Sequence, residues 1–255
     1  MALAPSVIDT FFLIGSFLYV ASVIGLALIL KKFDKITGHT ARKIVHLFCG
    51  FAVFIVPFLN IPFLALLISF PVLLFIRWAG PDNIGALVFE MMAEKDEKEV
   101  GYLSGPFSYA LSINILVFIF SFNGLNRFFY FPASSIMVMM ISDTIASVIG
   151  RKYGKHKINI GYTKTIRSVE GSLALFVSAF LLSMLGFAFF GNWFPDNTQF
   201  FDIGELLLLS FIVAINSTII EMISPSNIDD LTVPITGCLL SLGVAALLFP
   251  SAIGL

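Results

Sequence analysis

The chain has little charge for its length. Only 12% of its 255 residues are Asp, Glu, Lys or Arg, whereas 58% are hydrophobic. Soluble domains carry about a quarter charged residues, so this composition excludes an ordinary soluble domain and predicts an integral membrane protein. The net charge of −1 and the lack of a long basic face argue against nucleic acid as a partner.

Cysteine is almost absent too. Cys49 and Cys238 lie far apart, in separate apolar segments. Two isolated cysteines exclude a disulfide framework and a structural zinc site, so we interpret both as packing residues. The P-loop pattern GxxxxGK[ST] does not occur, which excludes that common type of phosphate-binding loop.

Long apolar runs dominate what is present. Runs of about 17–25 residues can cross a bilayer as helices. Eight occur, near residues 11–30, 43–59, 61–79, 105–122, 128–149, 171–191, 203–221 and 231–249. No Lys or Arg precedes the first run, which indicates a retained span and not a secretory signal peptide. We therefore predict an all-α membrane protein, a single domain over 1–255 with about eight transmembrane helices.

The positive charges predict the orientation of this bundle. In the eight-span model, 14 of the 15 Lys and Arg residues fall on one side, in the stretches 31–43, 77–104 and 150–170. Arg127 alone lies on the other side. Since basic loops stay in the cytoplasm, these three stretches are expected to be cytoplasmic and both termini extracytoplasmic.

One acidic residue, Asp143, lies within the fifth apolar run. A charge at membrane depth costs roughly 2.5–3.5 kcal/mol on insertion scales and is a functional candidate by default. On a helix Asp143, Ser147 and Arg151 share one face, beside the small residues Ala146 and Gly150. Asp143 is suited to hold Mg²⁺ or to accept a proton from a hydroxyl group. The alternative is a structural Asp143–Arg151 pair.

A basic segment follows Asp143. Its cations are Arg151, Lys152, Lys155, Lys157, Lys164 and Arg167. Gly150, Gly154 and Gly161 are interspersed, and glycine permits close approach of backbone to phosphate. The alternative is a basic cytoplasmic loop that serves only topology and contact with anionic lipid.

Two other clusters are predicted at the same cytoplasmic boundary. Arg42, Lys43 and His46 open the second run. The two cations suit anions or lipid head groups, and His46 suits proton transfer or ordinary core packing. At the end of the seventh run and the start of the eighth lie three carboxylates, Glu221, Asp229 and Asp230. One aspartate could cap a helix, but three carboxylates favour an edge of a metal site.

The remaining polar segments carry less signal. The acidic stretch 90–99 is interpreted as a solvated connector. A transporter would spread polar groups along a path through the membrane. Here they gather at one boundary, which favours an enzyme-like site over the non-enzymatic alternative, a carrier for small anions.

Four motifs together resemble the CTP-dependent lipid-alcohol kinases, which include the phytol, farnesol and dolichol kinases and the fungal-type diacylglycerol kinase. They are Arg42–His46, Asp143–Lys155, Arg167–Ser172 and Asp230–Pro234. The resemblance implies a multi-span enzyme that transfers the γ-phosphoryl group of CTP to a membrane alcohol with the help of Mg²⁺. The expected partners are a lipid alcohol, a nucleotide and the bilayer, and the protein could form a homo-oligomer.

The resemblance places Asp143, Arg151, Lys155, Arg167 and Glu170 in the nucleotide site and Asp230 at its far edge. Together with the clusters described above, it leads to the following assignments. Asp143 and His46 are the expected catalytic residues. The expected metal ligands are Asp143, Glu221, Asp229 and Asp230. The expected nucleotide-binding residues are Arg42, Lys43, Arg151, Lys155, Lys164, Arg167, Ser168, Glu170 and Gly171.

Two positions depart from the family pattern. Arg167 stands where Lys is usual, and Asp229-Asp230 stands where Asp-Asn is common. The Asp143–Lys155 motif is also similar to that of phosphatidate cytidylyltransferase, which uses CTP and Mg²⁺. The long C-terminal signature of that enzyme is absent from this chain, so a kinase is the leading prediction and a cytidylyltransferase the second.

Overall fold

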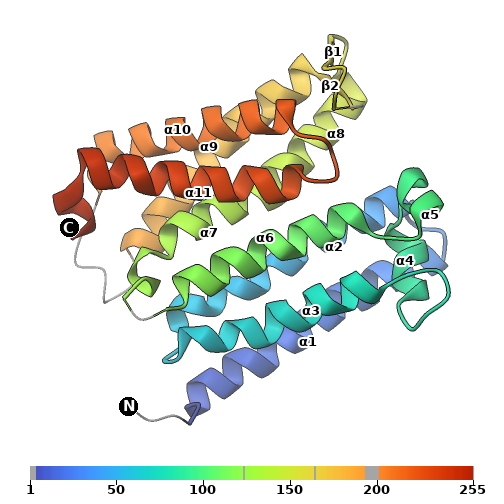
Figure 1. Cartoon of the computed structure of the whole chain (residues 1–255), viewed down its shortest axis with the longest axis horizontal. Coiled ribbons are helices and arrows are strands. Elements are labelled where there is room, and N and C mark those ends of the chain that lie inside the picture. The colour runs from blue at the N-terminus through green and yellow to red at the C-terminus, as the bar shows by residue number, and fades with distance from the viewer. Residues whose placement is uncertain (1–3, 123, 164, 193–200, 255) are drawn as a thin grey trace. The chain divides into compact units, whose positions relative to one another are not determined.

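The computed structural model describes residues 4–122, 124–163, 165–192 and 201–254. Nearly all secondary structure in this part of the chain is helical (Figure 1). The helices group into two compact units, Met1–Phe122 and Asn123–Leu255. These are called the N-terminal and the C-terminal unit below. The predicted single domain stays a prediction.

The N-terminal unit contains six α-helices in its described part. They are α1 (Val7–Lys32), α2 (Gly38–Cys49), α3 (Leu66–Trp78), α4 (Ala86–Met92), α5 (Lys95–Val100) and α6 (Ser104–Phe120). Two 3₁₀ helices, Gly50–Phe58 and Pro62–Ala65, continue α2 and lead into α3. α1 packs against α2, and α3 packs against α6. Phe89, Leu103 and Val45 are among the buried residues of the core between these helices.

The start of α1 is fixed by side-chain hydrogen bonds. The Ser6 hydroxyl accepts the Asp9 backbone N–H, and the Asp9 carboxylate accepts the Ser6 N–H in return. This capping box satisfies backbone donors that the first helical turn leaves open. The same carboxylate accepts the N–H of Asn60 at 2.7 Å, which ties α1 to the turn before α3.

The C-terminal unit contains five α-helices and one hairpin in its described part. They are α7 (Tyr130–Met137), α8 (Asp143–Tyr153), β1 (Lys157–Asn159), β2 (Ile166–Ser168), α9 (Val169–Asn192), α10 (Ile203–Ile223) and α11 (Asp229–Leu248). Short 3₁₀ helices lie at Asn126–Phe128 and Pro250–Ile253. α9 packs against α7, α8 and α10, and α11 packs against α10 and α7.

The apolar helices match the predicted runs. Six helical segments are long and apolar enough to cross a membrane: Val7–Lys32, Gly38–Phe58, Asn126–Tyr153, Val169–Gly191, Ile203–Ile223 and Asp229–Leu248. The shorter helices Pro62–Trp78 and Ser104–Phe120 account for the other two runs. This agrees with the predicted all-α, multi-pass membrane architecture. The number of crossings and the orientation of the termini stay predictions.

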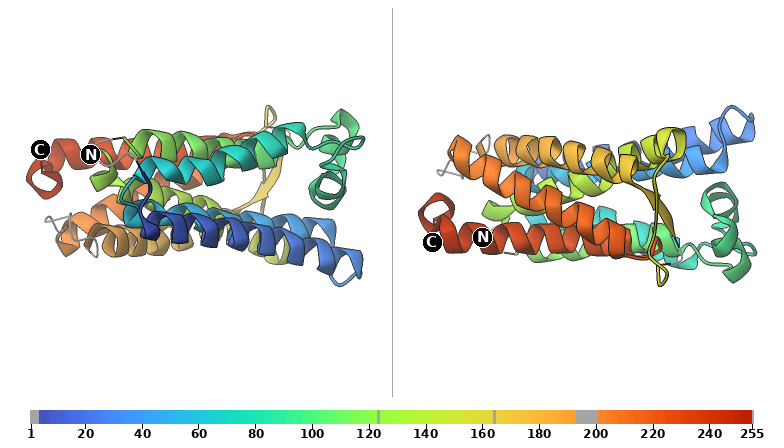
Figure 2. Two further views of the ribbon diagram at one scale, coloured as in Figure 1. Left: turned by 90° about the horizontal axis from the view of Figure 1, so that it is seen from below. Right: turned by 90° about the horizontal axis from the view of Figure 1, so that it is seen from above.

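The hairpin was not predicted. β1 and β2 pair antiparallel, with Lys157 opposite Ser168 and Asn159 opposite Ile166, where the sequence indicated only a basic loop. Two strands of three residues each give a weak sequence signal, because strand recognition depends on alternation over about four to eight residues. Figure 2 shows the hairpin from two further sides.

Candidate functional site

Asp143 lies where the regular geometry of its span is interrupted. A π-helical turn, Val138–Ser142, joins α7 to α8, and Asp143 is the first residue of α8. Such turns are rare within helices and are frequent at functional sites. The face predicted from the sequence is present, since Asp143, Ser147 and Arg151 all lie on α8.

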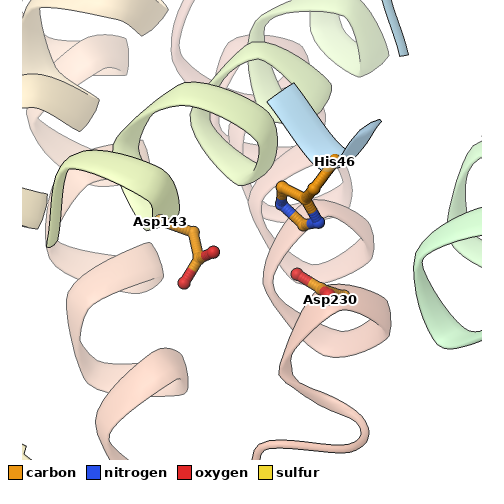
Figure 3. Close-up of side chains that lie close together, drawn as sticks. All are labelled: His46, Asp143 and Asp230. Carbon is orange, nitrogen blue, oxygen red and sulfur yellow. The ribbon is translucent and has the colours of Figure 1, made fainter. Parts of the chain in front are cut away.

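Asp143 and Asp230 come together. Asp230 lies in the first turn of α11, and one carboxylate oxygen of each residue lies within 4.8 Å of the other (Figure 3). Asp229 is close enough to both for their charges to affect it electrostatically. Two of the predicted metal ligands from distant parts of the sequence are thus neighbours in the fold.

The donor chemistry of this pair fits a magnesium ion. Mg²⁺ prefers octahedral oxygen ligands at about 2.0–2.1 Å, so two of its ligand atoms lie about 2.9–4.2 Å apart. The two carboxylate oxygens lie within 4.8 Å of each other, close to that range. Two carboxylates supply only part of such a shell, which phosphate and water oxygens usually complete.

Arg167 on β2 binds the other two predicted metal ligands, Glu221 and Asp229. Its Nη1 donates to Glu221, and its Nη2 donates to Asp229 at 3.2 Å and to the carbonyl of Ser224 at 2.8 Å. All three charged side chains are largely buried, with 11–14% of each exposed. Glu221 and Asp229 bind Arg167, whereas Asp143 and Asp230 are the two predicted metal ligands with carboxylate oxygens within 4.8 Å of each other.

The start of α11 differs from the capping prediction. Asp229 is the first residue of the helix, and neither aspartate caps it through a side chain. The Asp229 Oδ1 atom accepts the backbone N–H of Asp230 at 3.0 Å. A carboxylate in the first helical turn is favourable there because it complements the helix dipole.

Hydrogen bonds hold the hairpin at both of its ends. The Tyr162 hydroxyl, in the turn between the strands, donates to the carbonyl of Ile223 at the end of α10. Before β1, the His156 Nδ1 atom lies 2.8 Å from Glu170 Oε1, and the backbone N–H of His156 also donates to that carboxylate. The predicted nucleotide ligand Glu170 therefore has a structural partner in His156.

Glycine and serine bring α8 and α9 into close contact. A Cβ added at Gly154 would lie 2.2 Å from the Gly150 carbonyl and 2.6 Å from Ser168 Oγ. One at Gly171 would lie 3.2 Å from the Cα of Gly150. Two of the glycines assigned to phosphate, Gly150 and Gly154, thus face protein atoms, whereas the space around Gly161 is open. The small residues of α8 thus allow α9 to approach its backbone closely.

Ser168 has a clear local role. Its Oγ accepts the backbone N–H of Gly171 at 3.2 Å, at the start of α9. This is the N-cap interaction that satisfies an open donor of a first helical turn. The motif Arg167–Ser172 therefore joins the hairpin, α9 and the α10–α11 turn.

The remaining predicted cations of this unit are more accessible. Arg151 and Lys155, at the end of α8 and just after it, are exposed. Exposed cations near the carboxylates can attract an anion without first breaking a buried pair. Lys164 lies outside the described residues.

In the N-terminal unit, Arg42 binds a carboxylate of the protein, whereas the sequence indicated an anion or lipid head groups as its partner. Its Nη1 donates to Glu97 at 2.5 Å, and only 15% of its side chain is exposed. Glu97 also accepts the backbone N–H groups of Glu94 and Gly105. The prediction of a solvated acidic connector is wrong for Glu97, which is 4% exposed.

His46 is buried on α2. Its ring lies against that of Tyr109, with the centroids 4.4 Å apart, and the Tyr109 hydroxyl donates to the His46 carbonyl. Lys43, three residues earlier, is half-buried on the same helix. The predicted roles of His46, Arg42 and Lys43 in binding or catalysis stay predictions.

Sequence reasoning missed four residues that hold these clusters in place, namely Glu97, Tyr109, His156 and Tyr162. For Glu97 a signal existed. Glu94 and Glu97 have the i, i+3 spacing of a capping box, which the structure contains at the start of α5. For Tyr162 the sequence held no such signal, since its partner is a backbone carbonyl.

Comparison with known proteins relates the chain to one group. It is 29% identical over 231 residues to a protein named phytol kinase from Synechocystis sp., a match that covers 88% of this chain and 87% of the other. Proteins named probable phytol kinase, chloroplastic, from Triticum aestivum and Zea mays are 28% and 27% identical, and the match covers 73% of each. No family model and no solved structure matches the chain. The chain is thus similar over most of its length to proteins named phytol kinase, and the resemblance to the lipid-alcohol kinases that the four motifs carry is confirmed.

Proposed function

We propose that this protein is a Mg²⁺-dependent kinase that transfers the γ-phosphoryl group of CTP to a membrane lipid alcohol, such as phytol or another polyprenol, at the cytoplasmic face. The observation that carries the proposal is the approach of Asp143 and Asp230 within a chain related to phytol kinases. Phosphoryl transfer depends mainly on positioning and charge stabilisation, which a group of carboxylates and cations can supply.

The carboxylates have two tasks. Asp143 and Asp230 would hold the metal, which when bound neutralises the phosphate oxygens and orients them. Asp143 is also the first candidate to accept the proton of the substrate hydroxyl, since a general base must lie within hydrogen-bond reach of the reacting group. The motif that contains His46 makes that residue the second candidate for this task.

The cations bind the nucleotide in this proposal. Arg151 and Lys155 are exposed and near the end of α8, so they can pair with phosphate oxygens at little desolvation cost. Lys164 is a further cation that the motifs predict at the nucleotide. The lipid would enter from the bilayer and present its hydroxyl at the boundary where these groups lie.

The decisive experiment supplies both substrates. The purified protein is incubated in lipid nanodiscs with γ-labelled CTP, Mg²⁺ and, in separate reactions, phytol, farnesol, geranylgeraniol, dolichol or diacylglycerol. The proposal expects label in a lipid monophosphate and loss of that product when a chelator removes the metal. Parallel reactions with labelled ATP, GTP and UTP test the choice of nucleotide.

Other outcomes would contradict the proposal. In a further reaction with phosphatidate as acceptor, release of pyrophosphate together with transfer of CMP to the lipid phosphate identifies a cytidylyltransferase. Anion flux into vesicles without nucleotide turnover identifies a carrier. The kinase and the cytidylyltransferase leave different labelled products, and a carrier leaves none. One set of incubations and one flux assay therefore separate the three functions.

A further inference from the structure

Most hydrogen-bond donors of the Arg167 guanidinium are used by other groups of the protein. The guanidinium has five N–H donors, and three of them are used by Glu221, Asp229 and the Ser224 carbonyl. A fourth, on Nε, is buried and has no hydrogen-bond partner among the described residues. Because the Nε donor is buried, it is not open to an incoming phosphate, which leaves one donor, on Nη1, whereas a bidentate grip on phosphate needs two.

Asp229 links Arg167 to the carboxylate pair. Its Oδ2 atom accepts from Arg167, and its Oδ1 atom accepts the backbone N–H of Asp230 at 3.0 Å. The side chain of Asp230 in turn lies within 4.8 Å of Asp143. Arg167 is thus connected to the candidate metal ligands through a single intervening side chain.

Arg167 also holds the end of α10. Glu221 lies in the last turn of this helix, and Ser224 is the residue that follows its end. A cation stabilises a helix C-terminus by binding its open carbonyls and by complementing the helix dipole. One side chain therefore fixes the turn between α10 and α11 from both helices.

The strand that carries Arg167 is itself held in place. Ser168, the next residue, caps α9, and the hairpin turn is fastened to α10 by the hydrogen bond from Tyr162 to Ile223. Figure 2 shows the hairpin running beside the end of α10. The position of the Arg167 side chain is therefore set by α9 and α10 before any ligand binds.

We propose that Arg167 is a positioning residue for the carboxylate site and not a ligand of the nucleotide phosphates. By holding Glu221 and Asp229, it fixes the first turn of α11 so that Asp230 faces Asp143. The inference rests on the proposed function in assigning this site to phosphoryl transfer. The contacts that carry it do not depend on the identity of the nucleotide or of the lipid.

Two variants test the inference, with one matched control. Arg167→Lys keeps the charge but lacks the planar fork that reaches two carboxylates and a carbonyl. Glu221→Gln removes the negative charge that binds Arg167 while keeping the shape of the Glu221 side chain. Lys157→Gln is the control, because Lys157 is an exposed cation on the same hairpin.

The first measurement needs no turnover. Binding of Mn²⁺ to the purified proteins is followed by electron paramagnetic resonance without nucleotide. Loss of groups that orient a metal ligand typically weakens metal affinity by about 10–100-fold, so Arg167→Lys and Glu221→Gln should each weaken Mn²⁺ binding about 10-fold. Lys157→Gln should leave it within about twofold.

The second measurement separates positioning from phosphate binding. At saturating Mg²⁺, both variants should lower kcat while the KM for CTP changes by less than about threefold. The kcat of the double variant should be no lower than that of the less active single variant, because the two residues act through one contact.

The inference is overturned if Arg167→Lys raises the KM for CTP about 10-fold while Mn²⁺ affinity is unchanged. It is also overturned if the isosteric Glu221→Gln leaves Mn²⁺ binding at the wild-type value, which covers the case in which Arg167→Lys does not fold. If the wild-type protein phosphorylates none of the alcohols while both variants bind Mn²⁺ more weakly than it does, the proposed function is refuted and the positioning role stands.

Discussion

The two units of this protein both bury an arginine against carboxylates, but they do so differently. In the N-terminal unit Arg42 meets one carboxylate, Glu97, and two backbone N–H groups also donate to Glu97. In the C-terminal unit Arg167 meets two carboxylates, and two more, Asp143 and Asp230, lie beside them. The first cluster balances one charge of each sign, whereas in the second two further carboxylates lie near Asp229, one of the two that bind Arg167.

The difference indicates which cluster is built for chemistry. A one-to-one buried pair surrounded by hydrogen bonds is a structural feature, because breaking it leaves a buried charge without its partner. Carboxylates brought together near one another raise the local negative potential, which favours binding of a cation. We therefore expect changes in the N-terminal cluster to affect stability first and changes in the C-terminal cluster to affect catalysis first.

The largest effect should come from Asp143→Asn or Asp230→Asn. Each change removes a candidate metal ligand, and phosphorylation of the lipid alcohol should fall at least about 100-fold, since each factor of ten corresponds to about 1.4 kcal/mol of transition-state stabilisation. A variant that loses activity but keeps its thermal unfolding temperature separates a catalytic role from a structural one. Initial rates with γ-labelled CTP and unfolding curves in detergent measure both effects.

Asp202→Asn is the matched control for these variants. Asp202 is exposed and caps α10 at its other end, and asparagine caps a helix about as well as aspartate. Activity of Asp143→Asn within about threefold of wild type would remove the basis for assigning catalysis to this cluster.

The next effect concerns stability in the N-terminal unit. Glu97→Ala leaves Arg42 buried without its carboxylate and should cost about 3–5 kcal/mol of unfolding free energy. Equilibrium unfolding in detergent by a chemical denaturant measures this loss. Glu99→Ala is the control, since Glu99 is exposed in the same segment and should change stability by less than about 0.5 kcal/mol. Equal losses in the two variants would show that the Arg42–Glu97 pair does not stabilise the unit.

The sequence predicted what depends on local composition. The apolar runs became helices at the expected places because hydrophobicity over some 20 residues decides whether a segment can enter a bilayer. Asp143 was recognised for the same reason, as a charge in an apolar run. Its meeting with Asp230 followed from the expectation that both lie at the same boundary of the membrane.

The partners of the arginines could not be predicted in this way. Arg42 and Glu97 are 55 positions apart, and Arg167 and Asp229 are 62 apart. Which carboxylate meets which cation depends on helix rotation and on loop paths, neither of which composition encodes. For a related reason the sequence did not predict that protein atoms lie against Gly150 and Gly154, because glycine permits close approach of any group, whether a phosphate or a neighbouring helix.

A smaller effect tests the interpretation of these glycines. Gly154→Ala places a methyl group 2.2 Å from the Gly150 carbonyl and should cost about 1–3 kcal/mol through overpacking. Gly161→Ala is the control, since open space surrounds Gly161, and it should change stability by less than about 0.5 kcal/mol. If Gly154→Ala instead left stability unchanged and raised the KM for CTP, Gly154 would be a phosphate-contacting residue.

The smallest effect compares one helix cap from each unit. Ser168→Ala and Thr37→Ala each remove a hydroxyl that accepts a backbone N–H in a first helical turn, a change that costs about 0.5–2 kcal/mol. Ser168 is 5% exposed whereas Thr37 is exposed. Water can replace the lost bond only for the α2 cap, so Ser168→Ala should lie at the upper end of that range and Thr37→Ala at the lower end. Denaturant unfolding of both variants measures the difference, and a larger loss for Thr37→Ala would show that the junction of the hairpin with α9 is not held by this cap.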